Sequence, residues 1–250
     1  MRTDNPVAVV TGGTGGIGAA TAEALAAAGF SVAVGFRRSA AAAESLAAAL
    51  PGAGHIAVNA PVNDSEALRA MAAVIGGRYA RCDVLVNCAG TTRFVPHGDL
   101  DGLDDALIDE IFTTNVRGSF AAVRALLPLL RESTRPGGAA VINISSIAAR
   151  TAMGSNIMYC ASKAALDNMT QSLARALAPA VRVISVSPGL VDTEFVKSLD
   201  PAWRDSQAAR TPLGRLARPG EVAAAVVAAV RDLTFTTGCV LSVDGGRPLS

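Results

Sequence analysis

A tyrosine and a lysine stand four positions apart in the run Tyr159-Cys-Ala-Ser-Lys163. On a helix, residues four apart share one face, so the phenol and the ammonium would lie side by side. Ser146 precedes the tyrosine by 13 residues and ends the strand-like run Val141-Ile-Asn-Ile-Ser-Ser. On its own a Y-x-x-x-K pair is common by chance, so its meaning depends on the other motifs of the chain.

A glycine-rich turn follows the first strand-like run, in Val7-Ala-Val-Val-Thr-Gly-Gly-Thr-Gly-Gly-Ile-Gly18. Glycine permits a positive φ and a close backbone approach, and the helix expected from Gly16 to Ala28 would offer unpaired amides to an anion. A strand, a turn and a helix in this order predict a dinucleotide pyrophosphate site. The spacing fits two patterns: T-G-x-x-x-G-x-G with Gly12, Gly16 and Gly18, or G-x-x-G-x-x-G with Gly12, Gly15 and Gly18.

The elements that must position these residues alternate along the whole chain, as short β-branched runs and long Ala/Leu-rich stretches. Continuously apolar runs suit parallel strands covered on both faces. We predict an α/β fold: one Rossmann-type domain over residues 1–250, a doubly wound parallel sheet of about seven strands with helices on both faces, in three αβα layers. The expected strands are Val7–Thr11, Ser31–Phe36, His55–Val58, Asp83–Asn87, Ala139–Ser145, Val181–Ser187 and Cys239–Val243.

The helical stretch Ala106–Leu130 has apolar residues around more than one face. A helix that is apolar on two sides must bury both. The sheet covers only one of them, so a subunit interface is the natural second partner. A large apolar core within one subunit is the alternative.

Composition excludes several classes of protein. The 22 Lys and Arg against 21 Asp and Glu leave a net charge of +1, which makes no electrostatic case for nucleic acid or an anionic membrane. The longest near-apolar stretch, Ala24–Phe36, is too short to span a bilayer. Four scattered cysteines and two histidines predict neither a disulfide framework nor a metal site. Arg2 alone is basic before Val7, so we expect no secretory signal and a cytoplasmic location.

Five further motifs join the glycine turn and the Ser146, Tyr159 and Lys163 set. With them the sequence resembles the short-chain dehydrogenase/reductase family, in its compact form and over essentially the whole chain. The length, the N-x-A-G element and Asn115 favour the compact glycine pattern and leave no residues for an added substrate domain. The five motifs are Asn87-Cys-Ala-Gly90, Asn115 in Thr-Thr-Asn-Val-Arg-Gly, Ser187-Pro-Gly-Leu-Val-Asp-Thr193, Pro212–Glu221 and Val243-Asp-Gly-Gly246.

The resemblance implies a catalytic tetrad of Asn115, Ser146, Tyr159 and Lys163. Tyr159 would protonate the substrate oxygen, and Lys163 together with the positive nicotinamide would lower the phenol pKa from about 10. Lys163 would also hold the nicotinamide ribose, Ser146 would donate to the substrate oxygen, and Asn115 would hold a water linking Lys163 to solvent. Ser145 is the rival of Ser146, but the spacing to the tyrosine favours Ser146.

The resemblance also implies a nicotinamide cofactor. Arg37 and Arg38 follow Phe36, which stands where an acid would select NAD(H), so we predict that NADP(H) is preferred over NAD(H). Gly15 adds no charge where many NADP-dependent relatives are basic, and Pro61 stands where an aspartate usually contacts adenine. The remaining cofactor-binding residues that the resemblance implies are Gly12, Thr14, Gly15, Gly16, Ile17, Gly18, Val62, Asn87, Ala89, Gly90, Tyr159, Lys163, Pro188, Gly189, Val191 and Thr193.

A substrate lid is expected at about residues 192–210. Beside Ser146, the expected substrate-binding residues are Phe94, Met153, Phe195 and Trp203, which could instead pack the lid against the body. This region has no cluster of basic residues that would indicate an anionic substrate.

The expected activity is therefore that of an NADP(H)-dependent oxidoreductase acting on a ketone or a secondary alcohol. The 3-oxoacyl-[acyl-carrier-protein] reductases are the best-known bacterial relatives. The segment Pro212–Glu221 agrees with them, but Ala152–Tyr159 departs from their G-x-x-G-Q-x-N-Y pattern. That activity stays an alternative, as does a non-catalytic NADP(H)-binding sensor.

The expected assembly is a homotetramer. Family members pair the two helices that here are Ala106–Leu130 and the helix at Tyr159, and they also pair their last strands, here Cys239–Val243. Four small residues on the second helix would allow close packing: Ala161, Ala164, Ala165 and Ala174.

Overall fold

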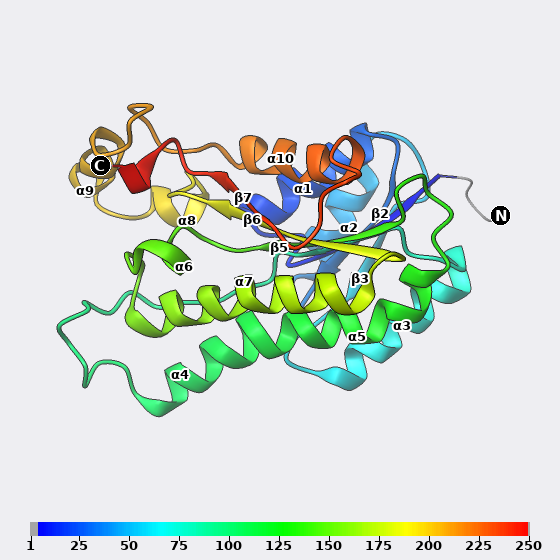
Figure 1. Cartoon of the computed structure of the whole chain (residues 1–250), viewed down its shortest axis with the longest axis horizontal. Coiled ribbons are helices and arrows are strands. Elements are labelled where there is room, and N and C mark those ends of the chain that lie inside the picture. Colours follow the sequence, from blue (N-terminus) through cyan, green and yellow to red (C-terminus); the bar gives the residue numbers. More distant parts are fainter. Residues whose placement is uncertain (1–4, 250) are drawn as a thin grey trace.

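The computed structural model describes residues 5–249, apart from the side chain of Phe195, so Arg2 lies outside the described residues. Its centre is one sheet of seven parallel strands in the order β3-β2-β1-β4-β5-β6-β7 (Figure 1). The strands are β1 Val7–Thr11, β2 Ser31–Phe36, β3 Ile56–Asn59, β4 Val84–Asn87, β5 Ala139–Ile144, β6 Val181–Pro188 and β7 Val240–Val243. The predicted doubly wound sheet is confirmed.

The strand order reverses at β1, which pairs with β2 on one side and with β4 on the other. Val9 accordingly lies opposite both Ala33 and Leu85. At such a switch point the connections leave to opposite faces of the sheet, and a crevice opens outside the carboxyl ends of the strands. The glycine turn and the segment after β4 both begin at this crevice.

Helices cover both faces of the sheet, which makes the three predicted layers (Figure 1). Leu25 and Val226 represent the buried cluster on the α1 and α10 side, and Met71 and Leu126 the cluster on the α3 and α5 side. The helical elements are α1 Gly16–Ala27, α2 Ala40–Ala49, α3 Ser65–Tyr79, α4 Asp105–Phe112, η1 Thr113–Gly118, α5 Ser119–Arg131, α6 Ala148–Thr151, α7 Ile157–Leu177, α8 Glu194–Lys197, α9 Pro201–Ala209, α10 Pro219–Arg231 and η2 Arg247–Leu249.

The single helix predicted over Ala106–Leu130 is in fact interrupted. A six-residue π-helical turn, η1, separates α4 from α5 and has Asn115 within it. The widened turn leaves room for polar contacts of Asn115 that a regular helix would not provide. Of its apolar residues, Ile111 and Leu126 are buried within the subunit, whereas Phe120 is 43% exposed, so the expected second partner of this helix stays a prediction.

Strand bounds differ from the predictions at a few ends. His55 precedes β3 rather than beginning it, because its Nδ1 accepts the backbone N–H of Val32 at 3.1 Å. No helix among residues 5–249 is long and apolar enough to cross a membrane. The described residues also hold no cluster of three or more His, Cys, Asp or Glu side chains that could bind a metal ion.

Candidate active site

Tyr159, Lys163 and Ser146 meet where β5 ends against the start of α7. Lys163 lies one turn after Tyr159 on α7, and its Nζ is 5.7 Å from the centre of the tyrosine ring. The same Nζ donates a 2.8 Å hydrogen bond to the carbonyl oxygen of Ile144, the last residue of β5. Ser146 follows two residues later. The strand end therefore sets the position of both the hydroxyl and the ammonium.

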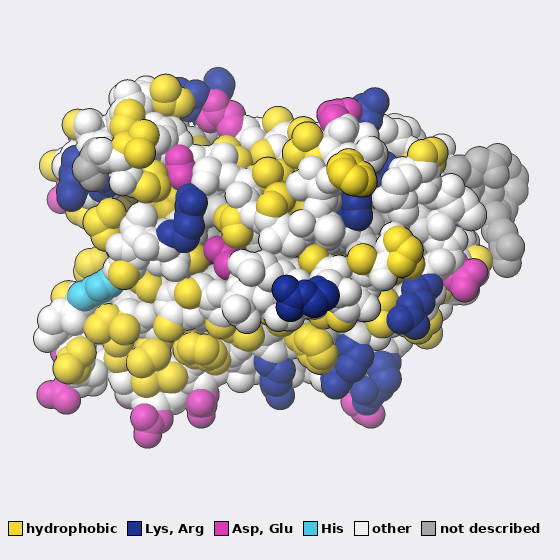
Figure 2. All heavy atoms as spheres, in the orientation of Figure 1, with side chains coloured by type: hydrophobic (Ala, Val, Ile, Leu, Met, Phe, Trp, Pro, Cys, Tyr) yellow, Lys and Arg dark blue, Asp and Glu magenta, His cyan; other side chains and the backbone are white. Residues whose placement is uncertain are grey.

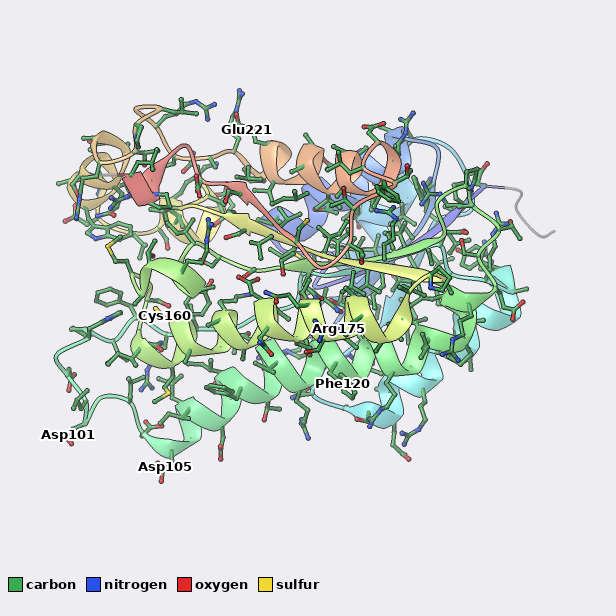
Figure 3. The ribbon with its side chains drawn as sticks, viewed as in Figure 1. Asp101, Asp105, Phe120, Cys160, Arg175 and Glu221 are labelled. Atoms are coloured by element: carbon green, nitrogen blue, oxygen red, sulfur yellow. The ribbon has the colours of Figure 1, made fainter. Side chains whose placement is uncertain are left out.

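The start of α7 is enclosed by α6 on one side. Figure 3 shows Cys160 between the two helices. Its Sγ would lie 2.8 Å from a Cβ placed on Gly154, so the segment before α7 passes close to the helix. This packing supports the first turn of α7, on which Tyr159 lies.

Burial shifts the pKa of both ionisable groups. It raises the pKa of the Tyr159 phenol, and a hydrogen bond with Ser146 offsets part of that rise. It lowers the pKa of the Lys163 ammonium to about 8, although Cys88 and Asp167 nearby act in the opposite direction. Burial is the largest influence on the phenol in the protein alone, and the lowering expected from Lys163 together with the positive nicotinamide stays a prediction.

Ser146 rather than Ser145 is placed to serve the site. Ser146 is partly exposed, and its Oγ accepts the backbone N–H of Ala148 at 3.2 Å. Ser145 is only 2% exposed, and its Oγ has no hydrogen-bond partner in the described structure. Ser146 is also near enough to the Tyr159 phenol to lower its pKa.

Asn115 holds the loop that follows β4. Its Oδ1 accepts the N–H of Thr91 at 2.8 Å, and its Nδ2 donates to the carbonyl of Thr91 at 3.0 Å and to Ser162 Oγ at 3.1 Å. A Cβ on Gly90 would lie 3.3 Å from Asn115 Oδ1 and 3.8 Å from Lys163 Nζ. Asn115 Oδ1 and Lys163 Nζ therefore both lie close to Gly90.

The glycine turn at the end of β1 leaves no room for side chains at two positions that face the protein. Gly12 has a φ of +63°, and a Cβ on it would lie 2.8 Å from the Cα of Ala89. A Cβ on Gly18 would collide with the carbonyl oxygen of Gly12. Thr14, Gly15 and Gly16 are exposed, and Ile17 is partly buried. A compact turn ahead of the N-terminus of α1 fits a dinucleotide pyrophosphate.

Arg37 and Arg38 directly follow β2 and are exposed. Arg37 and Pro61 lie at an open depression of about 670 Å³. Asp64 also lies there, but its Oδ1 caps α3 by accepting two backbone N–H groups. The complete lining is Arg37, Pro61, Asn63, Asp64, Ser65, Glu66 and Arg117.

Other predicted cofactor residues lie at or after the carboxyl ends of the strands, and they differ in burial and contacts. The Nδ2 of Asn87 donates inward, to Asn143 Oδ1 at 2.9 Å and to the carbonyl of Ser119, so its side chain serves the fold. Thr193 Oγ1 caps α8 by accepting the N–H of Val196. Val62 and Val191 are buried, Ala89 and Gly189 are partly buried, Gly90 is exposed, and Pro188 is the last residue of β6.

The predicted lid range holds the two short helices α8 and α9. An ion pair of 2.7 Å between Arg204 on α9 and Asp192 joins α9 to the segment after β6. Phe94 is 66% exposed, Met153 46% and Trp203 37%, so all three have apolar surface available to a ligand. The side chain of Phe195 lies outside the described residues.

One residue of the site was missed by the sequence reasoning. Asn156 is fully buried, and its Oδ1 accepts the backbone N–H of Tyr159 at 2.7 Å. Asparagine is among the preferred N-cap residues, so its position just before an apolar helical run was the available signal.

Comparison with known proteins gives relatives over the whole length. A family model described as enoyl-(acyl carrier protein) reductase matches residues 12–247. A Streptomyces violaceoruber protein named as a ketoacyl reductase of the granaticin polyketide synthase is 42% identical, with 100% of both chains covered. The cis-4-hydroxycyclohexanecarboxylate dehydrogenase of Sinomonas cyclohexanicum is 38% identical, with 96% of this chain and 95% of the relative covered.

Solved structures agree with these relatives. The crystal structure of a Burkholderia xenovorans protein described as a short-chain dehydrogenase/reductase superposes with a TM-score of 0.90 at 36% sequence identity, covering 100% of both chains. A Brucella melitensis protein described as a short-chain dehydrogenase/reductase of the glucose/ribitol dehydrogenase type gives a TM-score of 0.89 at 29% identity, with 99% of both chains covered.

Proposed function

The chain belongs to the short-chain dehydrogenase/reductase family, and we propose that it is an NADP(H)-dependent oxidoreductase that reduces a ketone to a secondary alcohol or catalyses the reverse reaction. Enzymes of this family are dehydrogenases and reductases acting on CH–OH groups. We further propose that residues 1–250 form one dinucleotide-binding domain, with α8 and α9 as its substrate lid.

The observation that carries the proposal is the convergence of Ser146, Tyr159 and Lys163 at the end of β5. The glycine turn and the crevice at β1 and β4 fit a nicotinamide dinucleotide, which when bound supplies or accepts the hydride. The phenol of Tyr159 gives its proton to the carbonyl oxygen as negative charge develops there. Ser146 donates a hydrogen bond to the same oxygen, and Lys163 holds positive charge near the phenol.

The direct test is turnover with a panel of ketones and secondary alcohols, using NADPH and NADP⁺ and following absorbance at the nicotinamide band. We expect oxidation of NADPH with at least one ketone class. Tight NADPH binding without turnover on any member of the panel would instead favour the non-catalytic sensor.

The pH dependence of ketone reduction should follow Lys163. Its pKa of about 8 means that the ammonium is charged below pH 8 and loses its charge above it. The phenol keeps its proton over this range, because its pKa is raised. We therefore expect kcat/KM for reduction to be level near pH 7 and to fall above about pH 8.

A Lys163→Arg variant tests whether deprotonation of Lys163 causes the fall in kcat/KM above pH 8. Guanidinium stays charged to much higher pH. Whatever activity the variant retains should therefore lose its decline above pH 8. A decline that stays at the same pH in the variant would show that another group causes it.

A ketoacyl thioester is a second candidate substrate, favoured by the 42% identity to the protein named as a polyketide ketoacyl reductase. The segment Ala152–Tyr159 differs from the 3-oxoacyl reductase pattern, which argues for a different ketone. Including a β-ketoacyl thioester in the ketone panel decides between them by comparing kcat/KM.

A homotetramer is the assembly we propose. Figure 2 shows hydrophobic side chains gathered along the face formed by α4, α5 and α7. Phe120, labelled in Figure 3, is 43% exposed on α5, and Ala161 and Ala164 are exposed on α7. Ala174 does not belong to this surface, because it is buried in the core of its own subunit.

Light scattering at micromolar concentration tests the assembly. We expect four times the 25.3 kDa chain mass. Phe120→Asp places a charge on the exposed apolar face and should lower the mass, because a charge is costly to bury in an interface. A monomer mass for the unmodified protein would contradict the proposal.

The proposed location is the cytoplasm. All four cysteines are unpaired, and Cys82 and Cys160 are buried. Burial raises the pKa of the Cys88 thiol to about 12, which keeps the thiol protonated and unreactive. Unpaired thiols of this kind suit a reducing compartment.

A further inference from the structure

We propose that Asn156 is a positioning residue that locks the loop Thr91–Val95 to the start of α7, so that the substrate-facing loop and Tyr159 keep one relative position. The inference rests on the proposed function and adds to it. It assigns to one buried amide two separable tasks, one for each end of its side chain.

The acceptor end of Asn156 fixes the catalytic helix. Its Oδ1 accepts the N–H of Tyr159 at 2.7 Å, which satisfies one of the unpaired donors in the first turn of α7. The side chain is fully buried, so water does not replace this bond if the cap is lost. The backbone of Tyr159 therefore depends on Asn156 for its position.

The donor end of Asn156 fixes the loop after β4. Its Nδ2 donates to the carbonyl oxygen of Arg93 at 2.7 Å and to Thr92 Oγ1 at 3.2 Å. Two further contacts join the same segments: Thr92 and Ser155 share a hydroxyl hydrogen bond, and the N–H of Val95 donates to the carbonyl of Ser155 at 2.9 Å. The loop is thus bonded along its length to the residues that lead into α7.

Asn115 holds the other end of this loop. Its amide bonds both the N–H and the carbonyl of Thr91, at 2.8 and 3.0 Å. Asn115 in η1 and Asn156 at the N-terminus of α7 therefore hydrogen-bond to the loop on either side of Thr92. Phe94 follows directly and is 66% exposed, so its position depends on that of the loop.

Loss of the Nδ2 bonds and loss of the Oδ1 bond of Asn156 should have different kinetic effects. Loosening the loop moves Phe94 and weakens substrate binding, which raises KM for the ketone. Loosening the first turn of α7 moves the phenol relative to the substrate oxygen, which lowers kcat because proton transfer depends on hydrogen-bond geometry. A variant that spares one end should therefore separate the two constants.

Asn156→Ser spares the acceptor end. Serine caps helices about as well as asparagine, but its short hydroxyl does not reach Arg93. We expect KM for the ketone to rise about 3- to 10-fold, the effect of one or two lost hydrogen bonds, with kcat within about 2-fold. Asn156→Ala removes both ends and should lower kcat as well.

Two further variants keep the test informative if Asn156→Ser folds poorly. Thr92→Val removes the Oγ1 acceptor from the loop without altering α7, and should raise KM in the same way. Arg231→Ala, at the exposed end of α10, is the control and should leave both constants unchanged.

Hydrogen exchange measured by mass spectrometry gives a readout that does not need turnover. Amides of residues 91–95 should exchange faster in Asn156→Ser, and those of residues 157–160 only in Asn156→Ala. The inference would be overturned if Asn156→Ser and Thr92→Val both had the KM of the unmodified protein and the same amide exchange in residues 91–95. Absence of ketone turnover by the unmodified protein would instead count against the proposed function and leave the exchange result as the test of the lock.

Discussion

Replacing Tyr159 by phenylalanine is expected to lower kcat for ketone reduction by about 10²- to 10⁴-fold, the usual contribution of a positioned general acid. The change removes one hydroxyl and keeps the ring. The backbone N–H of Tyr159 still bonds Asn156, so the helix start is preserved. Steady-state kinetics with saturating NADPH measures the loss.

The second tyrosine of the chain provides a matched control. Tyr79 is the last residue of α3, far from Ser146 and Lys163. Its hydroxyl donates a hydrogen bond to the carbonyl of Gly54. Tyr79→Phe should leave kcat unchanged and lower the free energy of unfolding by about 0.5–1.5 kcal/mol. NADPH affinity should be nearly unchanged in both variants, and a Tyr159→Phe protein that retains most of its kcat would show that another group donates the proton.

Replacing Arg37 by alanine is expected to remove most of the preference for NADPH. Losing one charged hydrogen-bond partner costs about 1.5–3 kcal/mol, or roughly 10- to 150-fold in affinity. Arg37 is the stronger candidate because it directly follows β2 and lies at the depression with Pro61. Its planar fork can meet two phosphate oxygens at once. The measurement is kcat/KM for NADPH and NADH in each variant.

The outcome for NADH distinguishes a phosphate contact from general damage. Arg37→Ala should lower kcat/KM for NADPH and change that for NADH little. Arg231→Ala, at the end of α10 and exposed, should change neither. A preference that survives Arg37→Ala moves the phosphate contact to Arg38, and an unmodified protein that uses NADH equally well contradicts the cofactor assignment.

Strand positions were the most predictable part of the fold. The runs Val7–Thr11 and Ser31–Phe36 coincide with β1 and β2, because strands buried on both faces are continuously apolar and end at turn residues. The pairing of Tyr159 with Lys163 was predictable for a similar reason, since four residues make about one helical turn. Both features depend on local sequence alone.

Features that depend on distant contacts were not predictable. The π-helical turn at Thr113–Gly118 is stabilised where Asn115 reaches Thr91, 24 residues earlier in the chain. The sequence of the helix alone favours a continuous α-helix. The bonds of Asn156 to Thr92 and Arg93 span more than 60 residues and leave no periodic pattern.

Transfer of a deuterium label from cofactor to product tests the central claim most directly. The protein would be incubated with NADPH deuterated at the transferred position and with the best ketone of the panel, and the alcohol analysed by mass spectrometry. The account predicts one deuterium on the carbinol carbon for each NADPH oxidised, in the unmodified protein and in Tyr79→Phe, and a strongly reduced rate in Tyr159→Phe. NADPH that binds tightly while no labelled alcohol forms from any ketone would contradict it.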